Sequence, residues 1–235
     1  MLEKHIMIFK ERIRVCNNTY IMRFESAIDT DKQWSFRAGQ FINIMITERV
    51  FRSYSILTSP TKYDKQRVIE LLVRSTDTGF GVGTSYLMSL KSGDNVVFMG
   101  AFGHFTIPLD STKQYTFIAT GTGITPFLSM FEEDNSLIHR TKLLYGGRDS
   151  DDIYYTHTLS TYPFLAYTQC LSRSNDTNDI TYNGRITSFL EHHMADFKGD
   201  NYYLCGNKDM VYDVYKQLLS YEVDRKCVFR EVFSS

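Results

Sequence analysis

The sequence predicts a mixed β and α/β fold, with an antiparallel β-barrel in its first half and a parallel α/β domain in its second half. In the first half, short apolar runs rich in β-branched residues are separated by turn residues. After residue 114, strand patterns alternate with helical patterns instead. The 235 residues suffice for two modest domains, which we expect to span residues 1–110 and 111–235.

Four runs in the first half read as strands, at residues 41–46, 53–57, 68–73 and 95–99. Turn residues with Gly or Pro separate these strands, as in Ala38-Gly39, Ser59-Pro60 and Ser92-Gly93. Residues 84–90 are an exception, because Leu87 and Leu90 lie three apart, as on one helical face. Short strands at this spacing are typical of a small antiparallel barrel.

The second half changes period. Residues 115–119, 142–145 and 202–205 read as strands, and residues 127–131 read as the start of a helix. Residues 209–219 carry a helical stripe formed by Val211, Val214, Tyr215 and Leu218. Alternating strands and helices favour a Rossmann-like parallel sheet.

Composition narrows the functional classes. The formal net charge is −1 and no long Lys/Arg run occurs, which argues against nucleic-acid binding as the main role. We see no secretory signal and no apolar run of membrane-spanning length, so we expect a cytoplasmic protein without a membrane partner. The four cysteines are widely spaced, which makes a cysteine-based zinc or iron–sulfur site improbable, and we expect no bound metal.

The first candidate site is Arg52-Ser53-Tyr54-Ser55, at a predicted strand. An arginine fork suits a phosphate, and a tyrosine two residues further shares its face and can cover an aromatic cofactor. Ser55 points to the other face and can form a hydrogen bond. The alternative is a plain edge strand with polar residues.

A second candidate is the glycine-rich segment from Gly79 and Phe80 to Leu87, which includes Gly81-Val82-Gly83-Thr84. We expect a helix to begin near Thr84, so that its free N–H groups point at a phosphate or pyrophosphate. The alternative is a flexible loop with a threonine N-cap.

The third candidate is Gly121-Thr122-Gly123-Ile124-Thr125-Pro126, between a predicted strand and a predicted helix. A strand, a glycine-rich turn and a helix N-terminus together form a dinucleotide phosphate site. Pro126 suits the first turn of a helix. The alternative is a tight turn without a ligand.

Two further sets are less distinctive. One set is Arg148, Arg173 and Arg185, which lie near predicted strand ends. Arginines there can bind a 2′-phosphate, and the alternative is that they are ordinary surface charges. Cys205-Gly206 ends a predicted strand. Cys205 is either a small buried hydrophobe or part of a nicotinamide pocket, and we do not expect a covalent nucleophile.

In this order, the motifs resemble the ferredoxin–NADP(+) reductase family over nearly the whole chain, and the bacterial-type members in particular. Arg52-Ser53-Tyr54-Ser55 resembles the family's R-x-Y-S motif, and Gly81 to Thr84 its G-x-x-S/T turn. Gly93-Asp94 and the segment from Gly100 to Phe105 resemble later family segments, with Ala101 where proline is usual. Gly121 to Pro126 resembles the G-T-G-x-x-P motif, and Cys205-Gly206 with Met210 the C-G-x-x-x-M segment.

The resemblance implies a flavoenzyme that holds FAD on the N-terminal barrel and NADP(H) on the C-terminal domain. It implies that Arg52 and Thr84 hold the flavin phosphate, that Tyr54 stacks on the ring and that Ser55 approaches the flavin N5. Main-chain groups of Leu71, Leu72 and Val73 would meet the ring edge. Arg173 and Arg185 would read the 2′-phosphate, with Arg148 as a third contact.

The resemblance also implies a reaction. Hydride would pass from NADPH, bound at Gly121 to Pro126, to the flavin, which would pass single electrons to a separate ferredoxin or flavodoxin. Arg37, Arg49 and Lys91 are candidates for the basic rim that such an acidic carrier needs. The segment from Arg230 to Ser235 differs from the aromatic end of plant-type members, so either Val232 or Phe233 would cover the flavin and act as a gate.

No ferredoxin-like cysteine segment occurs in the sequence, so we expect a separate acceptor protein. We also expect the reductase to be a monomer. Two alternatives stay open. One is an NAD(P)H:flavin reductase that uses free flavin as a substrate, and the other is a non-catalytic module that senses flavin or nucleotide.

Overall fold

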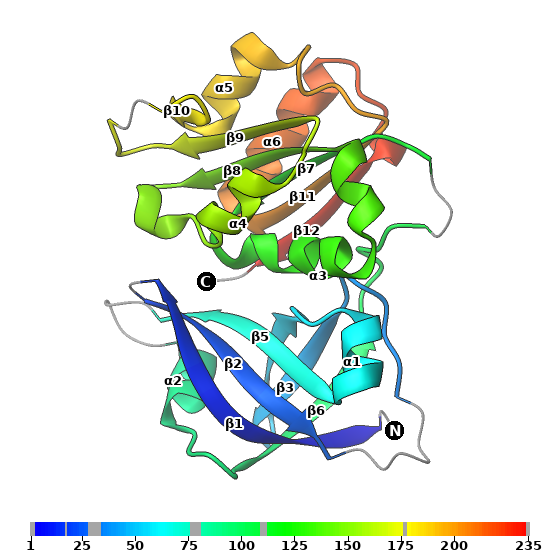
Figure 1. The fold of residues 1–235 in the computed structure, drawn as a ribbon, viewed down its shortest axis with the longest axis vertical. Coiled ribbons are helices and arrows are strands. Elements are labelled where there is room, and N and C mark those ends of the chain that lie inside the picture. The colour runs from blue at the N-terminus through cyan, green and yellow to red at the C-terminus, as the bar shows by residue number, and fades with distance from the viewer. Residues whose placement is uncertain are drawn as a thin grey trace. The chain divides into compact units, whose positions relative to one another are not determined.

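The computed structural model describes residues 3–16, 18–27, 34–75, 81–108, 112–175 and 178–233. The contacts divide the chain into two compact units. Residues 1–107 and 125–133 form the first unit, and residues 108–124 and 134–235 form the second. Figure 1 shows an antiparallel sheet in the first and a parallel sheet with covering helices in the second, which confirms the predicted fold class.

The first unit is built on six antiparallel strands in the order β4-β3-β6-β1-β2-β5. Their bounds are β1 (Lys4–Cys16), β2 (Thr19–Ser26), β3 (Phe41–Thr47), β4 (Val50–Ser55), β5 (Val68–Arg74) and β6 (Asn95–Phe102). The edge strands meet where Ile56 bridges Leu71 and the Leu57 N–H donates to the Glu70 carbonyl at 2.8 Å. This closure turns the sheet into a barrel and removes most of its open edges.

Side chains that point inward fill the barrel, among them Met7, Met22, Phe24, Ile44 and Phe98, none of them measurably exposed. Two helices, α1 (Pro60–Gln66) and α2 (Val82–Ser89), belong to this unit. Leu87 of α2 lies in the same core, which anchors that helix against the barrel.

Helix α3 (Thr125–Glu133) packs with the barrel. Its two terminal carboxylates accept hydrogen bonds from the start of α1: Glu132 from the Ser59 N–H at 2.8 Å and Glu133 from the Thr61 N–H at 2.9 Å. Anions are favoured at a helix N-terminus, so these contacts fix α3 to α1. The Ser129 hydroxyl adds a buried hydrogen bond to the Thr58 carbonyl at 3.0 Å.

The second unit is a six-stranded parallel sheet in the order β10-β9-β8-β7-β11-β12. Its strands are β7 (Tyr115–Thr120), β8 (Thr141–Gly147), β9 (Ala166–Leu171), β10 (Thr181–Asn183), β11 (Asn201–Asn207) and β12 (Val228–Phe233). Its helices are α4 (Thr156–Thr161), α5 (Ile186–His193) and α6 (Lys208–Ser220), with 3₁₀ turns η1 (Gly121–Ile124), η2 (Asn135–Arg140), η3 (Ser150–Asp152) and η4 (Arg225–Cys227).

The strand order creates a switch point. The chain runs outward from β7 through β8 and β9 to β10, then returns to β11 on the other side of β7. In open parallel sheets, ligands bind at the carboxyl ends of the strands where the order reverses. Here that point lies between the ends of β7 and β11, where Thr120 and Cys205 lie.

Candidate functional site

The predicted strand motif lies on β4, at the edge of the barrel sheet. Arg52 and Tyr54 pair with Ile44 and Ile42 of β3, so both side chains share one face of the sheet. The Ser53 hydroxyl donates to the Asn43 side chain at 2.7 Å on the opposite face. Ser55 lies on that opposite face too and is only 6% exposed.

Helix α2 approaches Arg52 and Tyr54 through a glycine. A Cβ atom built on Gly83 would lie 2.6 Å from the Tyr54 Oη and 2.8 Å from the Arg52 Cγ. Only a residue without a side chain allows the helix this close. The first turn of α2 therefore lies directly against the two side chains that the sequence singled out for a flavin.

The start of α2 differs from the sequence prediction. The helix begins at Val82, with Gly81 as the N-cap, rather than near Thr84. The helix thus includes Val82 and Gly83, which have low helical propensity, and its buried Leu87 packs in the barrel core. Gly81 provides no side-chain cap, so the first-turn N–H groups, including that of Thr84, are left by the helix for another acceptor. Gly79 and Phe80 lie outside the described residues.

The charge states at this site suit an anionic ligand. Burial raises the pKa of Tyr54 to about 12, against the opposing charge of Arg52, so the phenol is a neutral hydrogen-bond donor. Arg52 is exposed, and its Nη1 donates to the Phe51 carbonyl at 2.8 Å. In the described part of the chain, Arg52 makes no ion pair. An exposed guanidinium, a neutral phenol and open helix N–H groups fit a flavin with its phosphates.

Strand β5 offers main-chain groups but no side chains. Leu71, Leu72 and Val73 are at most 5% exposed. Beyond the bridge between Leu71 and Ile56, β5 continues with β2 on one side only, among the residues described. On the side away from β2, the main chain of β5 thus has no other strand partner among the residues described, and main-chain donors and acceptors are the groups that a planar ring edge can use.

In the second unit, two predicted motifs meet at the switch point. A Cβ on Gly123 would lie 2.3 Å from the Cys205 carbonyl oxygen, and a Cβ on Gly206 would lie 2.4 Å from the Thr120 Oγ1. The two glycine motifs therefore pack main chain against main chain. The Asn207 N–H donates to the same Thr120 Oγ1 at 3.0 Å, which ties the start of α6 to the end of β7.

The dinucleotide turn is tighter than predicted. Gly121 to Ile124 form the 3₁₀ turn η1, which runs directly into α3 at Thr125 and Pro126. The buried Tyr145 hydroxyl donates to the Gly121 carbonyl at 2.9 Å and so fixes the turn to β8. Thr122 is half-buried, whereas Thr125 and Pro126 are buried, which leaves their main chain rather than their side chains for a ligand.

The three arginines share the carboxyl edge of the parallel sheet. The Arg173 N–H donates to the Arg148 carbonyl at 2.6 Å, which places these two residues side by side after β9 and β8. Arg185 is the N-cap residue of α5, where the partial positive charge of the helix adds to its own. All three side chains are exposed, and none of them has an ion-pair partner within the described ranges.

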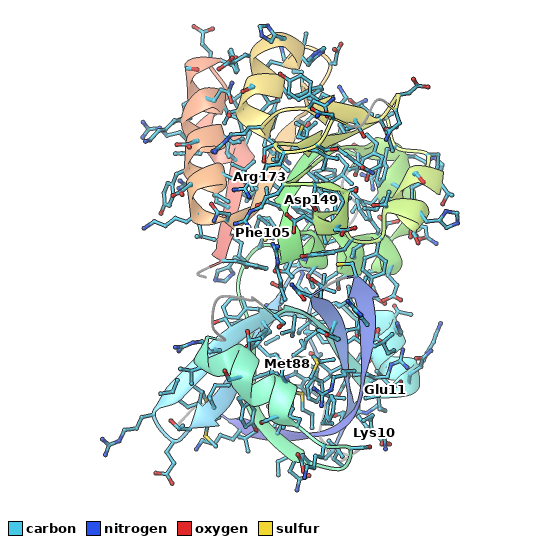
Figure 2. All side chains as sticks on the ribbon, turned by 90° about the vertical axis from the view of Figure 1, so that its left-hand side faces the viewer. Lys10, Glu11, Met88, Phe105, Asp149 and Arg173 are labelled. Atoms are coloured by element: carbon cyan, nitrogen blue, oxygen red, sulfur yellow. The ribbon has the colours of Figure 1, made fainter. Side chains whose placement is uncertain are left out.

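Sequence reasoning missed two neighbours of these arginines. Asp149 lies at the same end of the sheet as Arg173 (Figure 2). The Tyr182 ring covers Gly184, where a Cβ would lie 2.4 Å from the ring Cε1. A Tyr-x-Gly-Arg sequence directly before a helix is the signal that could have found the tyrosine.

Cys205 is fully buried, and burial, reinforced by the charge of Glu231, raises the pKa of its thiol well above the usual value. A thiol held neutral does not act as a nucleophile at neutral pH. Phe233 ends β12 opposite Asn207, while Ser234 and Ser235 lie outside the described residues. Val232, its neighbour, is 38% exposed.

Comparisons with known proteins identify both halves. Residues 7–107 match the oxidoreductase FAD-binding domain, and residues 117–216 match the oxidoreductase NAD-binding domain. The chain therefore belongs to the ferredoxin–NADP(+) reductase family of FAD- and pyridine-nucleotide-dependent oxidoreductases. This agrees with the resemblance seen in the sequence.

Relatives within the family have several roles. The chain is 34% identical over 152 residues to ferredoxin–NADP reductase B of Sorangium cellulosum, covering 55% of this chain and 59% of that protein. It is 26% identical over 215 residues to the reductase component of phenol 2-monooxygenase from Pseudomonas sp., covering 88% of this chain and 60% of that protein. The chain thus spans about 60% of the length of these curated relatives.

The ferredoxin–NADP(+) reductase of Plasmodium falciparum has the same fold, with a TM-score of 0.76 at 21% identity, covering 98% of this chain and 96% of that one. The FAD/NAD-binding domain of a Vibrio cholerae nitric oxide dioxygenase gives a TM-score of 0.80 at 19% identity, covering 98% and 99%. Among the described residues of the present chain, no helix is long and apolar enough to cross a membrane.

Proposed function

We propose that the chain is an NADPH-dependent ferredoxin or flavodoxin reductase. The observation that carries the NADPH assignment is the gathering of exposed arginines at the carboxyl edge of the parallel sheet. Arg173 and Arg148 are joined through their main chains, and Arg185 precedes α5. A cluster of guanidinium groups that have no carboxylate partner among the described residues is suited to the 2′-phosphate that distinguishes NADPH from NADH.

On the barrel, Arg52 and the first turn of α2 would hold the flavin phosphates, with Thr84 contributing its N–H and hydroxyl. Tyr54 would cover the ring, and its neutral hydroxyl would donate a hydrogen bond. Main-chain groups of β5 from Leu71 to Val73 would meet the polar edge of the ring. The resemblance assigns Ser55 to the neighbourhood of N5, on the face of β4 opposite to Tyr54.

On the parallel sheet, the η1 turn would receive the pyrophosphate of NADPH between Gly121 and Gly123. Cys205 and Gly206 would form one wall of the nicotinamide pocket, because their main chain packs directly against Gly123. The fully buried Cys205 thiol stays protonated and would act as a packing wall. Phe233 would cover the flavin until the nicotinamide displaces it.

Bound FAD would supply the chemistry, taking two electrons as hydride and passing them on one at a time. The protein would bind, orient and shield the reactants. The acceptor would be an acidic ferredoxin or flavodoxin, drawn by exposed basic residues such as Arg37, Arg49 and Lys91. We propose that the reductase acts as a cytoplasmic monomer.

The test compares nicotinamide donors. We expect the purified protein to oxidise NADPH faster than NADH with ferricyanide as the acceptor. Replacing Arg173 and Arg185 together by Ala should raise KM for NADPH about 10- to 100-fold, ~1.4–3 kcal/mol, while KM for NADH stays the same. Arg225→Ala is the matched control, because Arg225 is an exposed arginine on η4 of the same unit. Equal rates with both donors would refute the arginine assignment.

A second candidate is the reductase component of an oxygenase, favoured by the similarity to the phenol 2-monooxygenase reductase over 88% of the chain. Electron transfer to a ferredoxin, a flavodoxin or an oxygenase component, each tested at equal concentration, distinguishes these acceptors. A protein that loses its yellow colour on desalting and reduces added free flavin would indicate the flavin-reductase alternative. A protein that binds flavin without oxidising either nicotinamide would indicate a sensing module.

A further inference from the structure

Helix α2 lacks the residues that usually stabilise the ends of a helix. It has only eight residues, and its N-cap Gly81 makes no side-chain hydrogen bond. No acidic residue stands in its first turn and no basic residue in its last turn. Isolated helices of this length are unstable in water, so the position of α2 depends on contacts with the rest of the barrel.

One such contact, at the C-terminal end of α2, comes from an arginine that is distant in the sequence. The guanidinium of Arg12 on β1 donates through Nη1 to the Met88 carbonyl at 2.6 Å and through Nη2 to the Leu90 carbonyl at 2.9 Å. These carbonyls lie in the part of a helix that has no intrahelical donors. A cation is also favoured there by the helix dipole. Arg12 thus adds a two-point contact at the C-terminal end of α2, next to the hydrogen bond from the Leu90 N–H to the Leu87 carbonyl.

The geometry of β1 makes this contact possible. The pairing of β1 with β2 passes from Phe9 and Phe24 to Glu11 and Arg23, which leaves Lys10 as an extra residue in a bulge. A bulge reverses which residues face inward. As a result Arg12 lies opposite the fully buried Met22 and shares its face. Figure 2 shows Lys10 and Glu11 on β1 and Met88 on the neighbouring α2.

The opposite end of α2 carries the proposed phosphate site. Gly83 lies against Arg52 and Tyr54 there, and the helix is about 12 Å long, so Arg12 is too far away to touch a ligand itself. A helix held rigidly at its C-terminal end presents its N-terminal N–H groups in a fixed place. A helix released at that end can tilt away from β4.

We propose that Arg12 is a positioning residue for the flavin phosphate site, acting through α2. This inference rests on the proposed function, because it assumes that the first turn of α2 binds the phosphates of FAD. Arg12 would therefore affect FAD, which carries a pyrophosphate, more than riboflavin, which has the same ring and no phosphate.

The test titrates wild-type and variant apoprotein with both flavins, following the quenching of flavin fluorescence. We expect Arg12→Met to weaken FAD binding about tenfold, ~1.4 kcal/mol, while riboflavin affinity changes less than twofold. Arg12→Lys retains the charge but not the two guanidinium nitrogens that donate together. Its FAD affinity should lie between those of wild type and Arg12→Met. The control is Arg14→Met, which removes the same charge from the same strand and should leave the preference for FAD unchanged.

A purely structural role would lower the affinity for both flavins in equal proportion, and this result would overturn the proposal. If Arg12→Met does not fold, the Arg12→Lys titration decides in the same way. If wild-type protein binds no FAD at all, the proposed function and this inference both fail. If it binds FAD tightly and the ratio of the two affinities is the same in every variant, only the role of Arg12 fails.

Discussion

Substitution of one glycine at the switch point should weaken nucleotide binding and leave FAD binding unchanged. In Gly123→Ala, the new Cβ would lie 2.3 Å from the Cys205 carbonyl oxygen, 2.6 Å from its carbon and 2.7 Å from the Gly206 Cα. Ordinary van der Waals contact begins at 3.4 Å. The ends of β7 and β11 would therefore have to separate by about an ångström, and all three opposing atoms belong to the main chain, which cannot rotate aside.

Overpacking of this kind costs about 1–3 kcal/mol. If the main chain that moves is that of the nucleotide site, this cost weakens nucleotide binding. The Kd for NADP(+) should then rise about 5- to 150-fold, at 1.4 kcal/mol per factor of ten. Calorimetric titration of holoprotein with NADP(+) measures this change, and the flavin absorbance of the same sample reports whether FAD is retained. We expect weak nucleotide binding with full FAD content.

Gly83→Ala is the reciprocal variant, because its Cβ would meet Arg52 and Tyr54 on the barrel. It should lose FAD and keep NADP(+) affinity. A Gly123→Ala protein that binds NADP(+) as tightly as wild type would mean that the close approach of the two glycine motifs is unnecessary for the site.

Glu70 and Cys205, which are buried, and Tyr54, which is half-buried, can each be tested by a single substitution. Burial alone would raise the pKa of Glu70, but hydrogen bonds and charges from Lys62 and Arg23 outweigh it and lower the pKa. Its contribution to stability is therefore complete above the carboxyl pKa of the unfolded chain and is lost as pH falls through the lower pKa of the folded state. Melting temperatures measured against pH should fall more steeply on acidification for wild type than for Glu70→Gln, and parallel curves would contradict this. Tyr54→Phe removes one neutral donor and should weaken FAD binding about 2- to 10-fold by fluorescence titration, whereas an unchanged Kd would show that the hydroxyl is unused. Cys205→Ser places a hydroxyl in a fully buried position and should cost ~1–3 kcal/mol in denaturant unfolding. It should not alter the pH dependence of NADPH oxidation, because the thiol is neutral throughout that range, and an altered profile would indicate a thiolate.

The sequence was most informative where apolar runs were uninterrupted. β3, β5, β6, β7, β8 and β11 were all predicted within a few residues, because buried strands leave continuous apolar or alternating patterns. The strand motif at Arg52 was predicted slightly late, since β4 begins at Val50 and ends at Ser55. The helical stripe at Val211, Val214 and Leu218 matched α6.

Strands β1 and β2 were missed for a physical reason. β1 carries several exposed charged residues, and the bulge at Lys10 breaks its alternation, so neither period dominates. β12 was missed because its exposed residues alternate with half-buried ones at the sheet edge. α1 was missed because Ser59-Pro60 reads as a turn, whereas Ser59 caps the helix and Pro60 occupies its first turn.

The candidate site was predictable as a set of motifs but not as an arrangement. The spacing of Arg52 and Tyr54 places them on one face by period alone. The contact between Gly123 and Cys205 depends on the strand order, which brings together residues 82 positions apart. Tertiary packing also determines where α2 starts and allows Arg12 to donate hydrogen bonds to its C-terminal end. Neither feature can be predicted from a local sequence pattern.

In the proposed function, this chain passes electrons from a nicotinamide to its own bound FAD. Anaerobic mixing of the purified yellow protein with one equivalent of NADPH, followed by the flavin absorbance, tests it most directly. We predict rapid bleaching of the flavin band by NADPH, slower bleaching by NADH, and recovery of the band when an oxidised one-electron carrier is added. A flavin band that stays unchanged after NADPH is added would contradict the proposed electron transfer.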